Sequence, residues 1–160
     1  MIMKLNEKDI KLLEILQENC RKSLKEIAKE TKRPITTIHE KIKRFENEGL
    51  IKKYTAVLDC EKLDFGQTVF VFVSIKYHFS DESKPLSQRE IAKKIARIPN
   101  VQDVHIIAGD WDILIKVKGR NIKEMSSFVI DKLRAIKGVD KTFTATCMEV
   151  IKEGTEIALN

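Results

Sequence analysis

The hydrophobic period of this chain changes once, and that change restricts the fold more than any other feature. Before residue 50, apolar side chains recur every three or four positions, as Ile35, Ile38 and Ile42 do. This is the spacing of an amphipathic helix. The run TVFVFVSIKYHF over residues 68–79 instead alternates with a period of two, which is typical of a β-strand. We therefore expect a helical first part and a second part built on a sheet.

Three helices are expected in the first part. Ser23 and Glu26 have the spacing of a capping box at the start of the second helix. Pro34 is expected at the first position of the third helix, where its missing N–H costs nothing. Gly49 is expected to end that helix in a left-handed conformation. The short link over residues 31–33 between the second and third helices is typical of a helix-turn-helix.

The third helix has a polar face opposite its apolar stripe, and this face suggests DNA binding. In a helix-turn-helix, the start of this helix enters the major groove, where Thr and Glu side chains contact base edges. Basic side chains around it contact phosphates and orient the protein. The candidates for base edges are Thr36, Thr37 and Glu40, with His39 on the flank, and those for phosphates are Lys32, Arg33, Lys43 and Arg44.

Charge supports this interpretation but leaves alternatives open. Residues 1–60 carry 14 Lys and Arg against 10 Asp and Glu, and the whole chain has a net charge of +6, which favours polyanions. A Lys-rich run is also typical of any solvated helical face. Glu40 is equally well spaced to pair with Lys43 or Arg44 on the helix surface, and His39 is interpreted first as an ordinary polar residue.

The second part has the element order β-α-β-β-α-β, which is the ferredoxin-like arrangement. The fold class expected for the chain is α+β, with an N-terminal winged-type helix-turn-helix domain and a C-terminal ferredoxin-like domain. The expected domains are residues 1–52, a linker strand and hinge over 53–66, and 67–160. The sequence predicts strands at 68–79, 101–108, 111–118 and 139–152, helices at 88–98 and 121–136, and a polar loop at 80–87.

The first strand of the second part is apolar on both faces, which predicts a dimer. Val69, Val71 and Val73 alternate with Phe70 and Phe72. Helices in this fold cover only one face of the sheet, so the second apolar face needs another cover. A second copy of the same sheet is the simplest one.

The chain lacks the sequence motifs of the common enzyme classes. Its three histidines, at positions 39, 78 and 105, have no metal-ligand spacing, and no phosphate-binding loop, dinucleotide fingerprint or GxSxG motif occurs. Three scattered cysteines argue for a reducing compartment, and no apolar run reaches membrane-spanning length. We expect a cytoplasmic protein that is not an enzyme and has no cofactor, no metal and no membrane partner.

Three motifs resemble the Lrp/AsnC family of transcriptional regulators. They are R-F-E-N-E-G-L-I at the end of the third helix, A-G-D-W-D-I-L-I-K-V in the middle of the second part and G-V-D-K-T-F-T-A-T near its end. The resemblance covers nearly the whole chain. Family members often have Leu-Ser where this chain has Arg33 and Pro34, and Arg where it has Lys41.

The resemblance implies that the second part senses an amino acid between dimers assembled into tetramers or octamers. By itself, the turn at Gly109 and Asp110 is also ordinary hairpin chemistry. The resemblance assigns it a role in effector binding, with Asp110 or Asp112 receiving the ammonium and backbone N–H groups receiving the carboxylate. Thr144, at the family's threonine position, would add a hydroxyl.

The expected function is therefore a sequence-specific regulator that binds double-stranded DNA, with an assembly modulated by a small effector such as an amino acid. Two rivals remain. Siroheme decarboxylase subunits are similar to this chain over their full length, and a coloured purified protein would favour such an enzyme. An effector-binding adaptor without DNA binding is the other, and the absence of salt-sensitive DNA binding would favour it.

Overall fold

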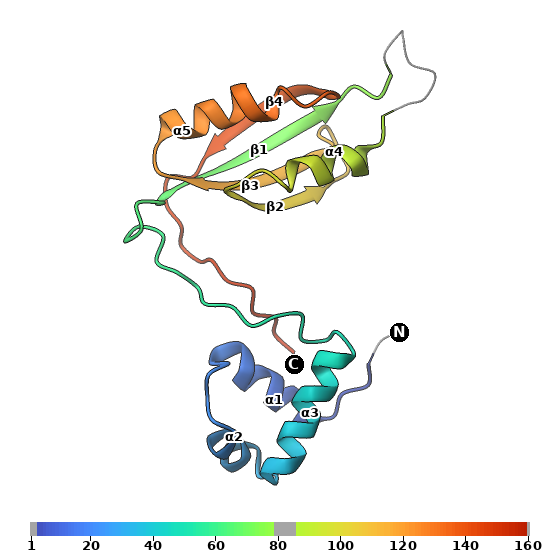
Figure 1. The fold of residues 1–160 in the computed structure, drawn as a ribbon, viewed down its shortest axis with the longest axis vertical. Helices are drawn as coiled ribbons and strands as arrows, with labels where there is room; N and C mark the ends of the chain where they lie inside the picture. Colours follow the sequence, from blue (N-terminus) through green and yellow to red (C-terminus); the bar gives the residue numbers. More distant parts are fainter. Residues whose placement is uncertain (1–2, 79–85, 160) are drawn as a thin grey trace. The chain divides into compact units, whose positions relative to one another are not determined.

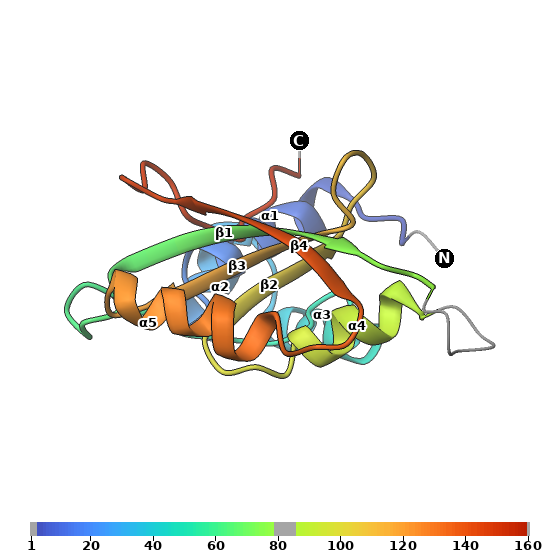
Figure 2. The ribbon, with the colours of Figure 1, turned by 90° about the horizontal axis from the view of Figure 1, so that it is seen from above.

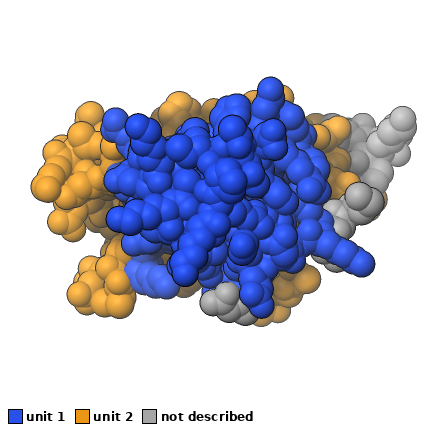
Figure 3. Space-filling view, turned by 90° about the horizontal axis from the view of Figure 1, so that it is seen from below, with its two compact units in different colours: residues 1–57, 152–160 blue, residues 58–151 orange. Residues whose placement is uncertain are grey.

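The computed structural model describes residues 3–78 and 86–159 and divides the chain into two compact units. We call residues 1–57 with 152–160 the helical unit, and residues 58–151 the sheet unit. Figure 1 traces the chain through both units, and Figure 3 colours them separately. In this division residues 152–160 are grouped with the helices.

The helical unit contains three helices around a small apolar core. They are α1 (Glu7–Glu18), α2 (Leu24–Thr31) and α3 (Ile35–Asn47). The predicted capping box is confirmed, because the Ser23 side chain accepts from the Glu26 N–H and the Glu26 carboxylate accepts from the Ser23 N–H. The buried core side chains are Leu12, Leu13, Ile15, Ile27, Ile38 and Phe45.

The start of α3 differs from the sequence prediction by one residue. Pro34 is the N-cap and not the first helical residue, and no side chain caps this helix start. Lys32, at the end of α2, has a left-handed backbone with φ of 52°, which lets the chain turn sharply into α3. Gly49 has φ of 71°, so the predicted left-handed residue after the helix is confirmed.

The C-terminal segment packs against the first helix. The Gln17 amide donates from Nε2 to the Ile157 carbonyl (3.1 Å), and its Oε1 accepts from the Ile157 N–H (2.8 Å). Leu159 packs against the core of the helical unit. The linker strand predicted within residues 53–66 does not form a regular strand, although every one of those residues is described.

The sheet unit has the predicted βαββαβ order. Its elements are β1 (Gln67–Ile75), α4 (Gln88–Ile95), β2 (Val101–Ile106), β3 (Ile113–Gly119), α5 (Ile122–Ser127), the π-helix η1 (Phe128–Leu133) and β4 (Val139–Thr146). The four strands lie in the order β2-β3-β1-β4, and all pairs are antiparallel. Figure 2 shows α4 and α5 on the same side of the sheet. Strands β1, β2 and β4 end earlier than predicted, whereas β3 begins two residues later and ends one residue later than predicted. Most of the predicted loop at 80–87 lies outside the described residues.

The core of the sheet unit lies between the sheet and these helices. Val71 of β1 and Ile115 of β3 are paired and fully buried, and Ile95 of α4 and Leu133 of η1 pack in the same cluster. At the last helix, Ile122 of α5 is 60% exposed, whereas Phe128 at the start of η1 is buried. The helix widens to a π-helix at Phe128, which shifts the side chains that follow relative to a regular α-helix.

The face of the sheet opposite α4 and α5 carries an aromatic cluster. The ring centroids of Phe72, Trp111 and Phe143 lie 6.0–6.2 Å from one another. Phe143 is 54% exposed. An exposed apolar group of this kind on one sheet face is typical of an interaction surface.

Candidate nucleic-acid interface and effector region

The polar face predicted for α3 is exposed in the structure. Ile38 and Phe45 anchor α3 in the core. The residues of the predicted interface that are exposed are Lys32, Thr36, His39, Glu40, Lys43 and Arg44, and Thr37 is half-buried. One surface of the helical unit therefore presents hydroxyl, carboxylate and basic groups around the start of α3.

Arg33 is the exception among the predicted interface residues, because an internal carboxylate binds it. Its Nη1 lies 2.9 Å from Asp9 Oδ1, and its Nη2 donates to Asn6 Oδ1 at 3.2 Å. Lys41 Nζ lies 3.2 Å from Asp9 Oδ2. The Arg33, Lys41 and Asp9 side chains are only 13%, 24% and 5% exposed.

Sequence reasoning missed the pairing of Asp9 with Arg33 and Lys41, and no local signal would have found it. Asp9 is 24 residues from Arg33 and 32 from Lys41 along the chain, far beyond the spacing of helix-surface pairs. Burial of the Asp9 carboxyl opposes its ionisation, but the hydrogen bonds from Arg33 and Lys41 outweigh this effect and lower its pKa. Asp9 is therefore an ionised buried group with two cationic partners.

Arg44 is placed differently, on the open surface of α3. Its Nε lies 2.6 Å from Glu48 Oε1, one helical turn on, and both side chains are about half exposed. The hydrogen bond that Arg44 donates to the Glu48 carboxylate raises the pKa of Arg44. The pairing of Glu40 with Lys43 or Arg44 that the sequence left open is not among the ion pairs of the described residues. Exposed pairs of this kind are weak, so a phosphate can replace Glu48 as the partner of Arg44.

The turn between β2 and β3 contains the predicted effector residues Gly109, Asp110 and Asp112. Gly109 has φ of 133°, a conformation that favours glycine. Asp110 is exposed and has no hydrogen bond or ion pair within the described ranges.

The Asp112 carboxylate, by contrast, is already engaged. Its Oδ2 accepts from the Ile75 N–H at 2.7 Å, and its Oδ1 accepts from the Tyr77 hydroxyl at 2.6 Å. The Gln88 side chain also donates to the Asp112 carbonyl. The hydrogen bond to Asp112 raises the pKa of Tyr77. Asp112 therefore joins the turn to the end of β1.

Thr144 lies apart from this turn within one chain. It pairs with Val71 on the far side of β1 from β3, so two strand spacings, about 10 Å, separate its strand from β3. The turn and β4 nevertheless approach each other within the chain through Trp111 and Phe143, the residue before Thr144, whose ring centroids are 6.2 Å apart.

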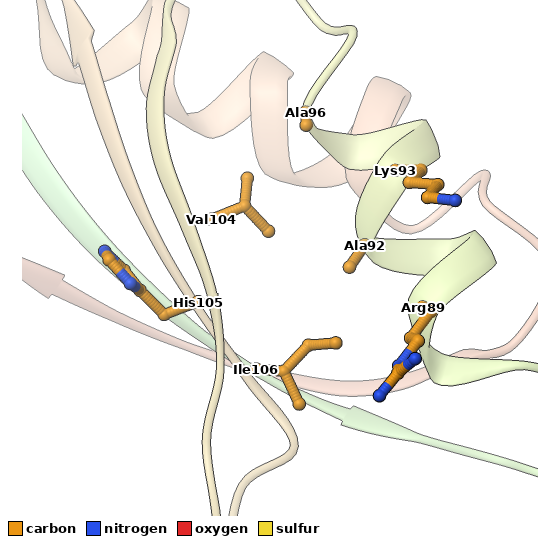
Figure 4. Close-up of a pocket in the computed structure, with 7 residues that line it drawn as sticks. All are labelled: Arg89, Ala92, Lys93, Ala96, Val104, His105 and Ile106. Atoms are coloured by element: carbon orange, nitrogen blue, oxygen red, sulfur yellow. The ribbon is translucent and has the colours of Figure 1, made fainter. Parts of the chain in front are cut away.

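The structure also has an open depression of about 470 Å³ beside this turn, between α4 and the edge strand β2. Figure 4 shows Val104 and Ile106 pointing from β2 toward α4, with His105 pointing away. Arg89 and Lys93 of α4 form its basic rim. None of the predicted effector residues lines it. No three His, Cys, Asp or Glu side chains gather into a possible metal site within residues 3–78 and 86–159.

Comparison with known families agrees with both units. Residues 5–52 match the family described as winged helix-turn-helix DNA-binding, and residues 68–157 match the Lrp/AsnC ligand binding domain. The molecule is thus a DNA-binding transcriptional regulator that joins a helix-turn-helix to a ligand-binding domain of the α+β class. The chain belongs to the Lrp/AsnC family.

Curated relatives are regulators of similar length. An HTH-type transcriptional regulator of Pyrococcus horikoshii is 43% identical over 149 residues, covering 93% of this chain and 96% of the relative. The HTH-type transcriptional regulator FL11 of Pyrococcus furiosus is 35% identical and covers 96% of this chain and 95% of its own length.

Solved structures show the same fold. The complex of the transcriptional regulator NMB0573 with L-Met, from Neisseria meningitidis, is 27% identical, covers 98% of both chains and has a TM-score of 0.88. AsnC of E. coli, at 21% identity, covers 96% of this chain and 99% of its own with a TM-score of 0.82. None of the helices formed by the described residues combines the length and apolarity that crossing a bilayer requires.

Proposed function

We propose that this regulator reads DNA with the exposed face of α3. The observation that carries the proposal is the exposure of Thr36, Glu40 and Lys43 on a helix whose other side is anchored by buried Ile38 and Phe45. A helix fixed in this way presents its start to the major groove. Thr36, Thr37 and Glu40 contact base edges, with His39 beside them.

Phosphate contacts come from the basic residues around that face. Lys32 precedes α3 and is exposed, and Lys43 and Arg44 lie further along the helix. Such contacts orient the helix but do not select sequence. They make binding depend steeply on salt, because each neutralised phosphate releases counterions.

We further propose that the protein is a dimer that assembles through the open face of the sheet. Phe70 and Phe72 of β1 are half-buried there, and Phe143 is largely exposed. A second sheet packed on this face removes those rings from water. A two-fold dimer presents two helical units to DNA, which favours pseudo-palindromic sites. The centres of the two half-sites are then about 34 Å apart, or a multiple of that distance.

The sheet unit senses an amino acid in this proposal. NMB0573, which shares this fold, forms a complex with L-Met. In our chain the exposed Asp110 receives the ammonium, turn N–H groups from Gly109 onward receive the carboxylate, and Asp112 fixes the turn. Thr144 joins from another copy, which couples effector binding to assembly into tetramers or octamers.

The protein acts as a regulator in the cytoplasm and not as an enzyme. Its curated relatives are transcriptional regulators, and no specific observation favours a siroheme-type enzyme or an adaptor without DNA binding. The decisive experiment is selection of bound genomic fragments, with and without a panel of amino acids. Enrichment of one sequence motif that changes with one amino acid supports the proposal. Recovery of no enriched motif contradicts it.

A further inference from the structure

Two basic side chains at the recognition helix are occupied by the protein itself. Arg33 immediately precedes α3 and Lys41 lies within it, yet both bind the same carboxylate, one on each oxygen of Asp9. The Arg33 guanidinium also donates to Asn6, the cap of α1. These two cations lie next to or near the exposed Lys32 and Lys43 in the sequence. They differ from those lysines because a buried carboxylate of the protein binds them.

Burial decides how firmly the pairing holds. The Asp9 side chain is 5% exposed and its partners 13% and 24% exposed. Removing either cation from such a pair leaves a buried carboxylate short of a partner, which is far more unfavourable than breaking a surface pair. A DNA phosphate approaching from solvent therefore does not displace Asp9, although it displaces the exposed Glu48 from Arg44 readily.

We propose that Asp9 is a specificity-determining residue that takes the place of a DNA phosphate for Arg33 and Lys41. This inference rests on DNA binding by α3. A cation whose charged group is held by Asp9 does not reach a DNA phosphate, so it releases no counterion on binding and adds nothing to the salt-dependent, sequence-independent affinity. Asp9 cancels only one of the two positive charges, so the effect comes from where the Arg33 and Lys41 groups are held. Specific binding is useful only in proportion to its excess over nonspecific binding. By binding Arg33 and Lys41, Asp9 stabilises the helical unit and lowers the affinity of the protein for nonspecific DNA.

The test compares two lysines two positions apart on the same helix. Full-length wild type, Lys41→Gln and Lys43→Gln are titrated with a labelled duplex of scrambled sequence at several salt concentrations. The slope of log affinity against log salt is expected to become shallower by about 0.9 for Lys43→Gln and to stay unchanged for Lys41→Gln. Arg33→Gln, which leaves Lys41 on Asp9, is a second test of the same point and is also expected to keep the wild-type slope.

The outcomes separate this inference from the proposed function. Equal losses of slope in Lys41→Gln and Lys43→Gln overturn the role of Asp9 and leave DNA binding by α3 intact. No loss in Lys43→Gln contradicts DNA binding by this face itself. Asp9→Asn, with its fold checked by circular dichroism, is expected to steepen the slope because Arg33 becomes available to phosphates; an unchanged or shallower slope overturns the inference.

Discussion

The Tyr77 hydroxyl donates a hydrogen bond of 2.6 Å to the carboxylate of Asp112, which lies 35 residues further along the chain. The second Asp112 oxygen accepts from the Ile75 N–H, just beyond the last residue of β1 that pairs with β3. A side chain thus continues the hydrogen bonding of the sheet where β3 has not yet begun. The residue that the family resemblance assigns to an effector also joins the start of β3 to the end of β1, the two inner strands of the sheet.

Exchanging Asp112 for Asn is therefore expected to reduce stability as well as effector binding. The variant loses the charge that strengthens both hydrogen bonds, and bonds to charged groups contribute about 1.5–3 kcal/mol each. We expect a loss of about 1–2 kcal/mol in the free energy of unfolding, measured by urea denaturation, and a tenfold or greater loss of amino-acid affinity by calorimetry. Wild-type stability in this variant would contradict the structural role.

Asp110→Asn provides the matched comparison in the same turn. The Asp110 carboxylate is exposed and has no hydrogen bond or ion pair in the described part of the chain, so the free energy of unfolding of this variant is expected to stay within about 0.5 kcal/mol of wild type. Its affinity for the amino acid is expected to fall about tenfold, because the ammonium loses its charged acceptor. If wild type binds none of the common amino acids, the sensing role is wrong.

Thr36 is expected to affect which sequence is bound, and Lys43 how strongly any sequence is bound. Thr36→Ala removes an exposed hydroxyl and methyl at the start of α3, so the preferred base at one position changes, with about 1–3 kcal/mol of discrimination lost. Lys43→Ala weakens all sequences about equally. Selection from a random duplex library measures the preferred sequence and the relative affinity of each variant. An unchanged preferred sequence in Thr36→Ala would show that Thr36 does not contact a base.

The open sheet face is tested by placing a charge on it. Phe143→Glu puts a carboxylate at the aromatic cluster, so the dimer is expected to dissociate at micromolar concentration in sedimentation velocity. Ile130→Glu is the control, because Ile130 is similarly exposed (57% against 54%) but lies on η1. A folded monomer in the wild-type protein, or equal effects of the two changes, would rule out assembly through this face.

The Asp9 pairing predicts how stability changes with pH. Because the folded state lowers the pKa of Asp9 below its ordinary value of 3.8, the stabilisation by its charge is fully present above that value. It is lost as the pH falls through the lower folded pKa. Asp9→Asn imitates the protonated side chain, so the stability difference from wild type is expected to be constant near neutral pH and to shrink below pH 3.8. Denaturant unfolding at a series of pH values measures this; a difference that grows in acid would contradict it.

The sequence predicted the local structure well wherever neighbouring residues determine it. The capping box at Ser23 and Glu26 and the left-handed Gly49 involve residues within a few positions of each other, so their geometry follows from residue type. The order βαββαβ was predicted from the change of hydrophobic period, and the antiparallel sheet confirms it. Element ends were less accurate, since Pro34 caps α3 from outside and the last helix widens at Phe128.

What the sequence alone determined is the class of each part: a helix-turn-helix with an exposed polar face on α3, and a sheet that is apolar on both faces. Periodicity and capping fix these properties within a few residues. Only the tertiary structure decided which charged groups are available, because Arg33 meets Asp9, and Tyr77 meets Asp112, across 24 and 35 residues of chain. Hydrogen bonds and burial at such separations depend on how the elements pack, and packing brings together residues whose spacing along the chain carries no sign of their contact.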